Sequence, residues 1–172
     1  YTTVEFSTSL RINAQGVRDD EDIGPKAPDE RRIVLLGDSL VMSVQVEFAE
    51  TYAHLLEQKL NATGSTARWR VINAGVQGYG PVDQWLFYRH VVEQLEPDVV
   101  LVVAFDAVSE FIFSGFSALQ ALSRDACKPF DRGRSGLTLG EGAAAILLAS
   151  SDRARGEGCE PVGELLGWAA SN

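Results

Sequence analysis

The chain of 172 residues is long enough for one domain with its own hydrophobic core, and its 45% hydrophobic and 23% charged residues are typical of a folded protein. Acidic residues outnumber basic residues by 24 to 15, and the net charge of −9 disfavours binding to nucleic acid or to an anionic membrane. Two cysteines cannot hold a domain of this size together, and the longest apolar run, at 99–105, is too short to span a bilayer. We therefore expect an acidic, soluble protein, and an N-terminus without a signal-peptide pattern favours the cytoplasm.

The first 105 residues alternate between predicted strands and predicted helices. Residues 1–30 are polar and irregular and are interpreted as a lead-in arm with a short strand at 2–6. Later runs of branched aliphatic residues are typical of strands buried on both faces, and segments with helical spacing separate them. The strands are predicted at 33–36, 69–73 and 98–105, and the helices at 47–60 and 83–95. This alternation predicts βαβ units with a parallel sheet and right-handed crossovers.

The chain after residue 105 has a different pattern. A helix is predicted at 108–122, a strand at 142–149, a short basic helix or turn at 152–158 and a last apolar segment at 162–169. Gly140, Gly142 and the alanines at 143–145 indicate a strand that helices cover closely, since bulky side chains would not fit there. The predicted fold class is α/β, with a single three-layer α/β/α domain over 31–172 and a mainly parallel sheet.

A serine directly follows the first predicted strand. Ser39 comes after Gly37 and Asp38, and Gly37 permits a sharp turn that places the serine at the carboxyl end of the sheet, where α/β proteins bind ligands. The segments RRIVLLGDSL, TYAHLLEQKL, VINAGVQGYG and PDVVLVVAF resemble the SGNH (GDSL) hydrolases in their order and spacing. For residues 1–105 this resemblance implies a flavodoxin-like fold and an esterase or acyl-transfer enzyme for a small acyl ester. Ser39 would be its nucleophile, with Gly37 and Asp38 in support.

The resemblance also implies an oxyanion hole built from the backbone N–H groups of Ser39 and Gly78, which are preorganised donors. A flexible turn between strand and helix is the alternative interpretation of Gly75, Gly78 and Gly80. Both interpretations remain open from the sequence.

The general base that a serine nucleophile needs does not follow from the sequence. The family has an Asn after the third strand and an Asp-x-x-His near the C-terminus, but here Asp106 follows Phe105 and no histidine occurs after His90. His54 and His90 lie inside predicted helices and are interpreted as surface or packing residues. The sequence therefore predicts an impaired hydrolase, because loss of a triad member removes most of the catalysis.

From residue 106 onward the chain resembles a second family. DAVSEFIFSGFSALQALS, CKPFDRGRSGLTLGEGAAAILL and ELLGWAASN are similar to an internal segment of the β-ketoacyl synthases, which have a thiolase-like fold and use a cysteine and two histidines. The matching segment corresponds to the part between the family's cysteine and its first histidine, and it contains neither of them. Cys127 and Cys159 lie in polar loops and are interpreted as passive thiols rather than activated nucleophiles.

The two resemblances meet at 105/106, which predicts a chimera, natural or designed, whose halves share one sheet. The main hypothesis is an impaired SGNH-type esterase. The alternatives are a non-catalytic α/β scaffold and a β-ketoacyl synthase fragment that binds an acyl carrier protein or a partner subunit. No cofactor and no metal site are expected, because the histidines and cysteines do not have the spacing of ligands.

Overall fold

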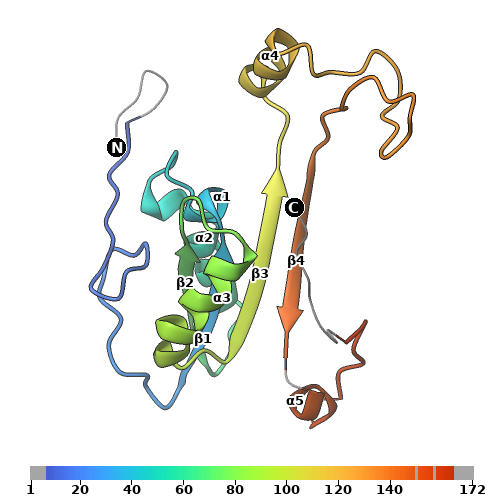
Figure 1. Ribbon diagram of the computed structural model, residues 1–172. Coiled ribbons are helices and arrows are strands. Elements are labelled where there is room, and N and C mark those ends of the chain that lie inside the picture. The colour runs from blue at the N-terminus through green and yellow to red at the C-terminus, as the bar shows by residue number, and fades with distance from the viewer. Residues whose placement is uncertain (1–6, 150, 157, 165–172) are drawn as a thin grey trace.

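A single sheet of four strands organises the computed structural model, which describes residues 7–149, 151–156 and 158–164 (Figure 1). The predicted strand at 2–6 lies outside the described residues, as does most of the predicted apolar segment at 162–169. The strands are β1 (Glu30–Gly37), β2 (Arg68–Gly75), β3 (Val99–Asp106) and β4 (Gly142–Leu148), in the spatial order β2-β1-β3-β4. The fold is mixed α/β.

The first three strands are parallel, as the alternation of strands and helices predicts. β1 pairs with β2 along its whole length, from Glu30 opposite Arg68 to Gly37 opposite Gly75. β3 pairs with β1 only over its first four residues, Val99 to Val102. β4 runs antiparallel to β3 over seven residue pairs, so the predicted mainly parallel sheet has an antiparallel edge strand.

Helices connect the parallel strands and begin at residues that favour helix starts. Thr51 caps α2 by accepting a hydrogen bond from the His54 N–H at 3.3 Å, and α3 begins with Pro81. The α-helices are α1 (Ser39–Met42), α2 (Tyr52–Asn61), α3 (Pro81–His90), α4 (Glu110–Ala118) and α5 (Ser151–Gly156), and the 3₁₀ helices are η1 (Phe48–Glu50) and η2 (Val92–Leu95). Each predicted helix is present but shorter than predicted, and that at 83–95 is divided into α3 and η2.

Side chains that alternate along β1 and β2 produce two apolar clusters, one on each face of the sheet. One cluster lies towards η2 and α3, and the other lies towards α1 and α2. The first contains Val17, Val34, Leu36, Ile72, Ala74, Val92 and Leu95, and the second contains Ile33, Leu35, Val41, Ala53 and Val71. The three parallel strands therefore lie between two helical layers.

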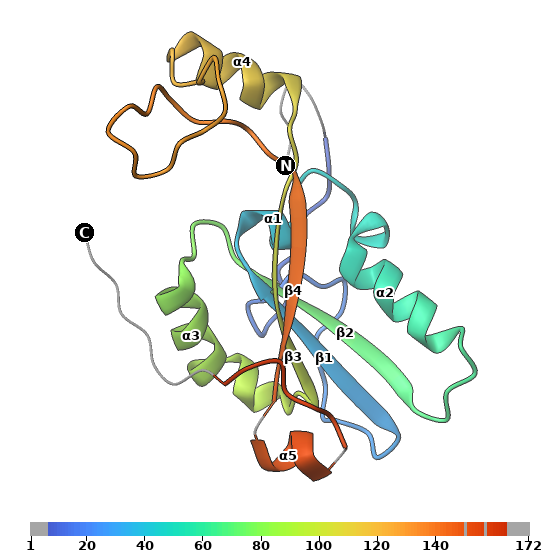
Figure 2. The ribbon, with the colours of Figure 1, turned by 90° about the vertical axis from the view of Figure 1, so that its right-hand side faces the viewer.

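The prediction that helices closely cover the strand at 142–149 is wrong. Every residue of β4 is exposed, including Ile146 at 58% and Leu147 at 59%. A Cβ added at Gly140 or Gly142 would meet no atom within 4 Å. α4 and α5 lie near opposite ends of the β3–β4 ribbon instead of on its faces (Figures 1 and 2). Small residues show how closely a neighbour could approach a strand, but they do not show that a neighbour is there.

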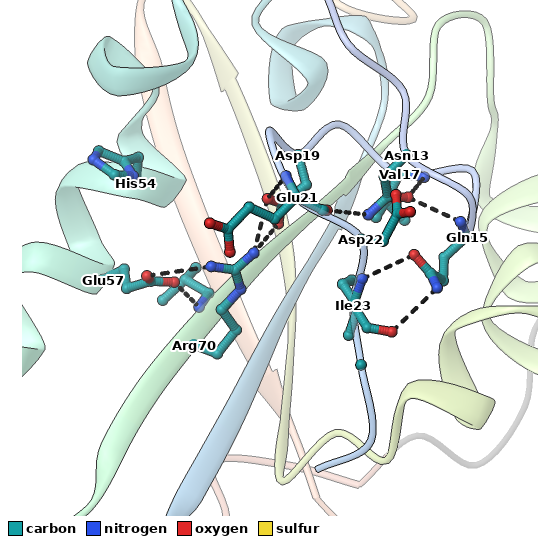
Figure 3. Close-up of polar contacts among 12 residues, drawn as sticks. Asn13, Gln15, Val17, Asp19, Glu21, Asp22, Ile23, His54, Glu57 and Arg70 are labelled. Carbon is teal, nitrogen blue, oxygen red and sulfur yellow. Dashed lines mark hydrogen bonds and ion pairs between the residues drawn. The ribbon is translucent and has the colours of Figure 1, made fainter. Parts of the chain in front are cut away.

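The polar arm before β1 packs against the body of the protein. Asn13, Val17, Arg18 and Asp19 are all buried, and Asp19 accepts two hydrogen bonds of 2.8 Å from the guanidinium of Arg70 on β2 (Figure 3). Buried polar groups need such partners, and this loop supplies them from its own residues and from β2. None of the helices within the described residues has the length and apolar character needed to cross a membrane.

Candidate functional site

The predicted nucleophile lies at the carboxyl end of β1, at the start of a one-turn helix. Ser39 is the first residue of α1 and is half-buried. Asp38 caps this helix, because its Oδ1 accepts a hydrogen bond of 2.9 Å from the Leu40 N–H. Asp38 therefore fixes the turn that presents Ser39, and the partner that positions its carboxylate is a backbone N–H rather than a catalytic side chain.

Two glycines allow α1 to lie directly on the ends of β1 and β2. A Cβ at Gly75 would lie 2.4 Å from the backbone nitrogen of Met42, and a Cβ at Gly37 would lie 2.0 Å from the Cγ2 of Val41. Gly37 has no positive φ, so the structure explains it by the room that Val41 needs rather than by a sharp turn. The glycines place the helix that carries Ser39 at the carboxyl edge of the sheet.

Gly78 lies in the loop after β2 and has a φ of +81°, in the left-handed region that favours glycine. It is exposed, and a hydrogen bond of 3.2 Å from the Tyr79 N–H to the Val76 carbonyl closes the turn around it. This backbone conformation accounts for the glycine as a turn residue. Its role as an oxyanion donor to a substrate at Ser39 stays a prediction.

Of the three residues that could act as a base for Ser39, two have other partners and the third is exposed. The His54 Nε2 lies 2.9 Å from the Gln58 side-chain nitrogen, and the ring packs at 5.2 Å from Phe48. His90 is exposed at the end of α3, and the Asp106 carboxylate accepts a hydrogen bond of 2.9 Å from the next backbone N–H. Within the described part of the chain, no hydrogen bond connects the Ser39 hydroxyl to a histidine or a carboxylate.

Tyr52 is a polar residue near this site that the sequence analysis missed. Its hydroxyl is buried without a hydrogen-bond partner, and its ring packs edge-on against Phe105 at the end of β3, with 6.1 Å between ring centroids. Burial raises the pKa of the Tyr52 hydroxyl, and the negative charge of Asp38 raises it further. In the sequence Tyr52 looks like one more apolar residue of an amphipathic helix, so no pattern distinguishes it.

Within the described residues, neither cysteine forms a hydrogen bond with a histidine. Cys127 is exposed in the loop after α4, where its Sγ lies 3.8 Å from the Gly136 carbonyl oxygen, and Cys159 is also exposed. Both histidines lie on α2 and α3, before the segment that contains the cysteines. Among the described residues, no group of three His, Cys, Asp or Glu side chains could hold a metal ion.

Comparison with known proteins supports one of the two resemblances. Residues 86–154 match the family described as "Beta-ketoacyl synthase, N-terminal domain", a match that begins within α3 and ends within α5. The matched segment thus includes β3, α4 and β4. It begins upstream of the predicted junction at 105/106, which stays a prediction together with the chimera.

Curated relatives point to the same family. The chain is 31% identical over 84 residues to 3-oxoacyl-[acyl-carrier-protein] synthase 2 of Staphylococcus aureus, covering 45% of this chain and 21% of the relative. It is 38% identical over 71 residues to Nodulation protein E of Rhizobium meliloti, covering 41% of this chain and 18% of the relative. The chain thus spans about a fifth of the length of these relatives. No solved structure matches the chain.

These findings change the balance between the hypotheses. The β-ketoacyl synthase resemblance, which was an alternative, is supported by the family match and by the relatives. The SGNH resemblance of residues 1–105, which was the main hypothesis, has no support from them. The mixed four-stranded sheet is consistent with a thiolase-like segment, whereas a flavodoxin-like first half is not shown.

Proposed function

We propose that the chain acts as a non-catalytic binding segment of the β-ketoacyl synthase type, with an acyl carrier protein as its partner. The observation that carries the proposal is the family match over residues 86–154, together with a relative whose name specifies an acyl-carrier-protein substrate. A binding role is consistent with the nucleophilic side chains of the segment, because the exposed thiols of Cys127 and Cys159 have no histidine partner among the described contacts.

The matched segment also carries a large share of the exposed apolar side chains, which mark binding surfaces when they gather together. On α4, Phe111 is 79% exposed and Phe113 is 52% exposed. On β4, three consecutive aliphatic residues from Ile146 to Leu148 are each about half exposed or more. These groups favour a role in which another molecule covers them.

Size-exclusion chromatography with a purified acyl carrier protein tests the proposal. We expect the chain to co-elute with the carrier at micromolar concentration and Phe111→Ser to weaken the association. Leu55→Ser is the matched control, since Leu55 is 43% exposed on α2, outside the matched segment. Separate elution at this concentration, or equal loss of binding in both variants, would contradict the proposal. Co-elution with a synthase subunit, but not with the carrier, would favour the alternative in which the partner is that subunit.

A second candidate is ester hydrolysis or acyl transfer at Ser39, and one structural observation favours it. Ser39 begins α1 at the carboxyl edge of the sheet, half-buried, beside the glycine-containing loop that follows β2. Labelling by a fluorophosphonate probe tests this candidate, with Ser39→Ala as the control for specificity. We expect slow labelling that requires Ser39, because none of the described residues is a base in contact with its hydroxyl. Equal labelling of the parent protein and the Ser39→Ala variant would refute a reactive serine.

A further inference from the structure

The segment that follows the Ser39 helix is held by the arm that precedes the sheet. Arg18 is 1% exposed, and its guanidinium donates hydrogen bonds of 2.8 Å to the Met42 carbonyl and 2.6 Å to the Val46 carbonyl. A third hydrogen bond goes to the Ser43 carbonyl. One side chain thus binds three carbonyl groups of the backbone that leaves α1. A planar guanidinium can do this because its N–H groups point in fixed, divergent directions.

Two further contacts connect the same two segments. The Thr8 hydroxyl donates a hydrogen bond of 2.7 Å to the Val44 carbonyl, and the Ser9 N–H donates one of 3.0 Å to the Glu47 carboxylate. The Asn73 side chain on β2, which forms a β-bridge with Arg18, donates a hydrogen bond of 2.8 Å to the Val41 carbonyl. The chain from α1 to residue 47 is therefore fixed by side chains from the arm and from β2.

The charge of Arg18 has no direct counter-ion in the part of the chain that the structure describes. Within the described residues its guanidinium forms no ion pair, and its Nε has no hydrogen-bond partner. Burial lowers the pKa of Arg18, while Glu47 and Asp20 act in the opposite direction. A buried cation is costly unless it is well coordinated, so the carbonyls at the end of α1 compensate for its desolvation. Carbonyls at a helix C-terminus carry partial negative charge, which suits a cation there.

We propose that Arg18 is a positioning residue for Ser39, and that residues 7–19 are a clamp which fixes the one-turn helix carrying that serine. This inference rests on the second candidate function, reaction at Ser39. Arg18 does not touch a substrate; it acts through the backbone of residues 42–46. Because α1 has a single turn, a movement of its carboxyl end is transmitted directly to Ser39 at its first residue.

Hydrogen exchange measured by mass spectrometry on the whole chain tests the clamp. We expect Arg18→Lys to raise the exchange rate of residues 40–46 by roughly tenfold or more, since a lysine keeps the charge but has one donor nitrogen in place of the two that bind the three carbonyls. Arg32→Lys is the matched control. Arg32 is also buried, at 3% exposure, and donates to the Leu95 and Gly24 carbonyls near the opposite end of β1. It should raise exchange around those residues and leave 40–46 unchanged.

Fluorophosphonate labelling supplies the readout that a merely structural residue would not affect. At a temperature where both variants are folded, we expect Arg18→Lys to label at Ser39 roughly tenfold more slowly, and Arg32→Lys to label like the parent protein. Equal exchange of 40–46 in the Arg18→Lys variant and the parent protein would overturn the clamp. If the parent protein labels, equal labelling of the two variants would overturn the positioning role of Arg18.

Two further outcomes are decided by the same measurements. If Arg18→Lys does not fold, Thr8→Val replaces it, because this change removes the hydroxyl that donates to the Val44 carbonyl. Local exchange at 43–46 must then rise for the clamp to stand. If the parent protein does not label at all, the hydrolase candidate fails and Arg18 has no catalytic role, whereas the exchange data still decide whether it fixes α1.

Discussion

Replacement of Gly75 by alanine should displace the helix that carries Ser39. A Cβ at this position would lie 2.4 Å from the Met42 nitrogen and 2.7 Å from the Val41 carbonyl carbon, whereas ordinary contacts begin at 3.4 Å. α1 or β2 must therefore move by 0.6 Å to reach the 3.0 Å limit of real Cβ contacts, and by 1.0 Å to reach an ordinary contact of 3.4 Å. The two nearest atoms belong to the backbone and the third is the Cβ of Val41, so no side-chain rotation can relieve the clash.

The expected cost is about 3 kcal/mol, the upper part of the range for overpacking in a well-packed core. With an m-value of about 2 kcal/mol/M, the urea midpoint should fall by about 1.5 M. Unfolding is followed by circular dichroism, and Gly24→Ala is the control, because a Cβ there meets no atom within 4 Å and no positive φ is required. That control should leave stability unchanged or raise it by up to about 1 kcal/mol. A Gly75→Ala protein as stable as the Gly24→Ala protein would refute the close approach of α1 to β2.

Three smaller changes test other parts of the structure. Asp38→Ala should lower the free energy of unfolding by about 1 kcal/mol in urea, because α1 loses its N-cap; an unchanged midpoint would count against that cap. Burial alone would raise the pKa of Asp98, but hydrogen bonds from Lys26 and the Arg32 N–H and the charges of Lys26 and Arg31 lower it overall. The stability that Asp98 contributes is therefore present above its unfolded pKa and is lost as pH falls through the lower folded pKa. In an acid titration, the parent protein should be more stable than Asp98→Asn at neutral pH, and this difference should disappear below about pH 4. Leu147→Thr should change stability by less than about 1 kcal/mol, because its side chain is already 59% exposed, and a larger loss would mean that β4 is covered in solution.

Much of the parallel part of the sheet could be predicted, because its continuous aliphatic runs directly indicate strands that are buried. Leu35 and Leu36 lie on opposite faces and belong to different apolar clusters, so a continuous aliphatic run there requires cover on both sides. β2 is likewise buried from Val71 to Gly75. Strand positions follow from such runs, and the helices between them follow from their spacing.

The direction and the surroundings of β4 could not be predicted in the same way. Its aliphatic residues indicate a strand, but its antiparallel direction depends on the path of the long connection after α4, which has little regular structure. Arg18 was missed for a related reason. A charged residue in a polar arm is expected to be solvated, and only the neighbouring Val17, which is 1% exposed, indicates that this part of the arm is inside.

For the candidate site, the sequence placed Ser39 correctly after a buried strand but could not supply its surroundings. The capping role of Asp38 is local, but the contact between Gly75 and α1 and the carbonyl contacts of Arg18 join residues far apart in the chain. The buried hydroxyl of Tyr52 depends on Phe105 in the same way. Interactions of this kind depend on the tertiary structure, and local patterns do not contain them.

β3 belongs to two cooperative units at once. Val100 to Val102 pair with both β1 and β4. Val99 pairs with β1 alone, and Val103 to Asp106 pair with β4 alone. Local unfolding of β4 leaves β3 paired with β1 at Val99 to Val102, so the chain should open in stages rather than all at once. A partner that covers β4 would add its binding free energy to the less stable stage only, so the two stages would merge on binding. The number of unfolding transitions would then report on whether β4 is covered.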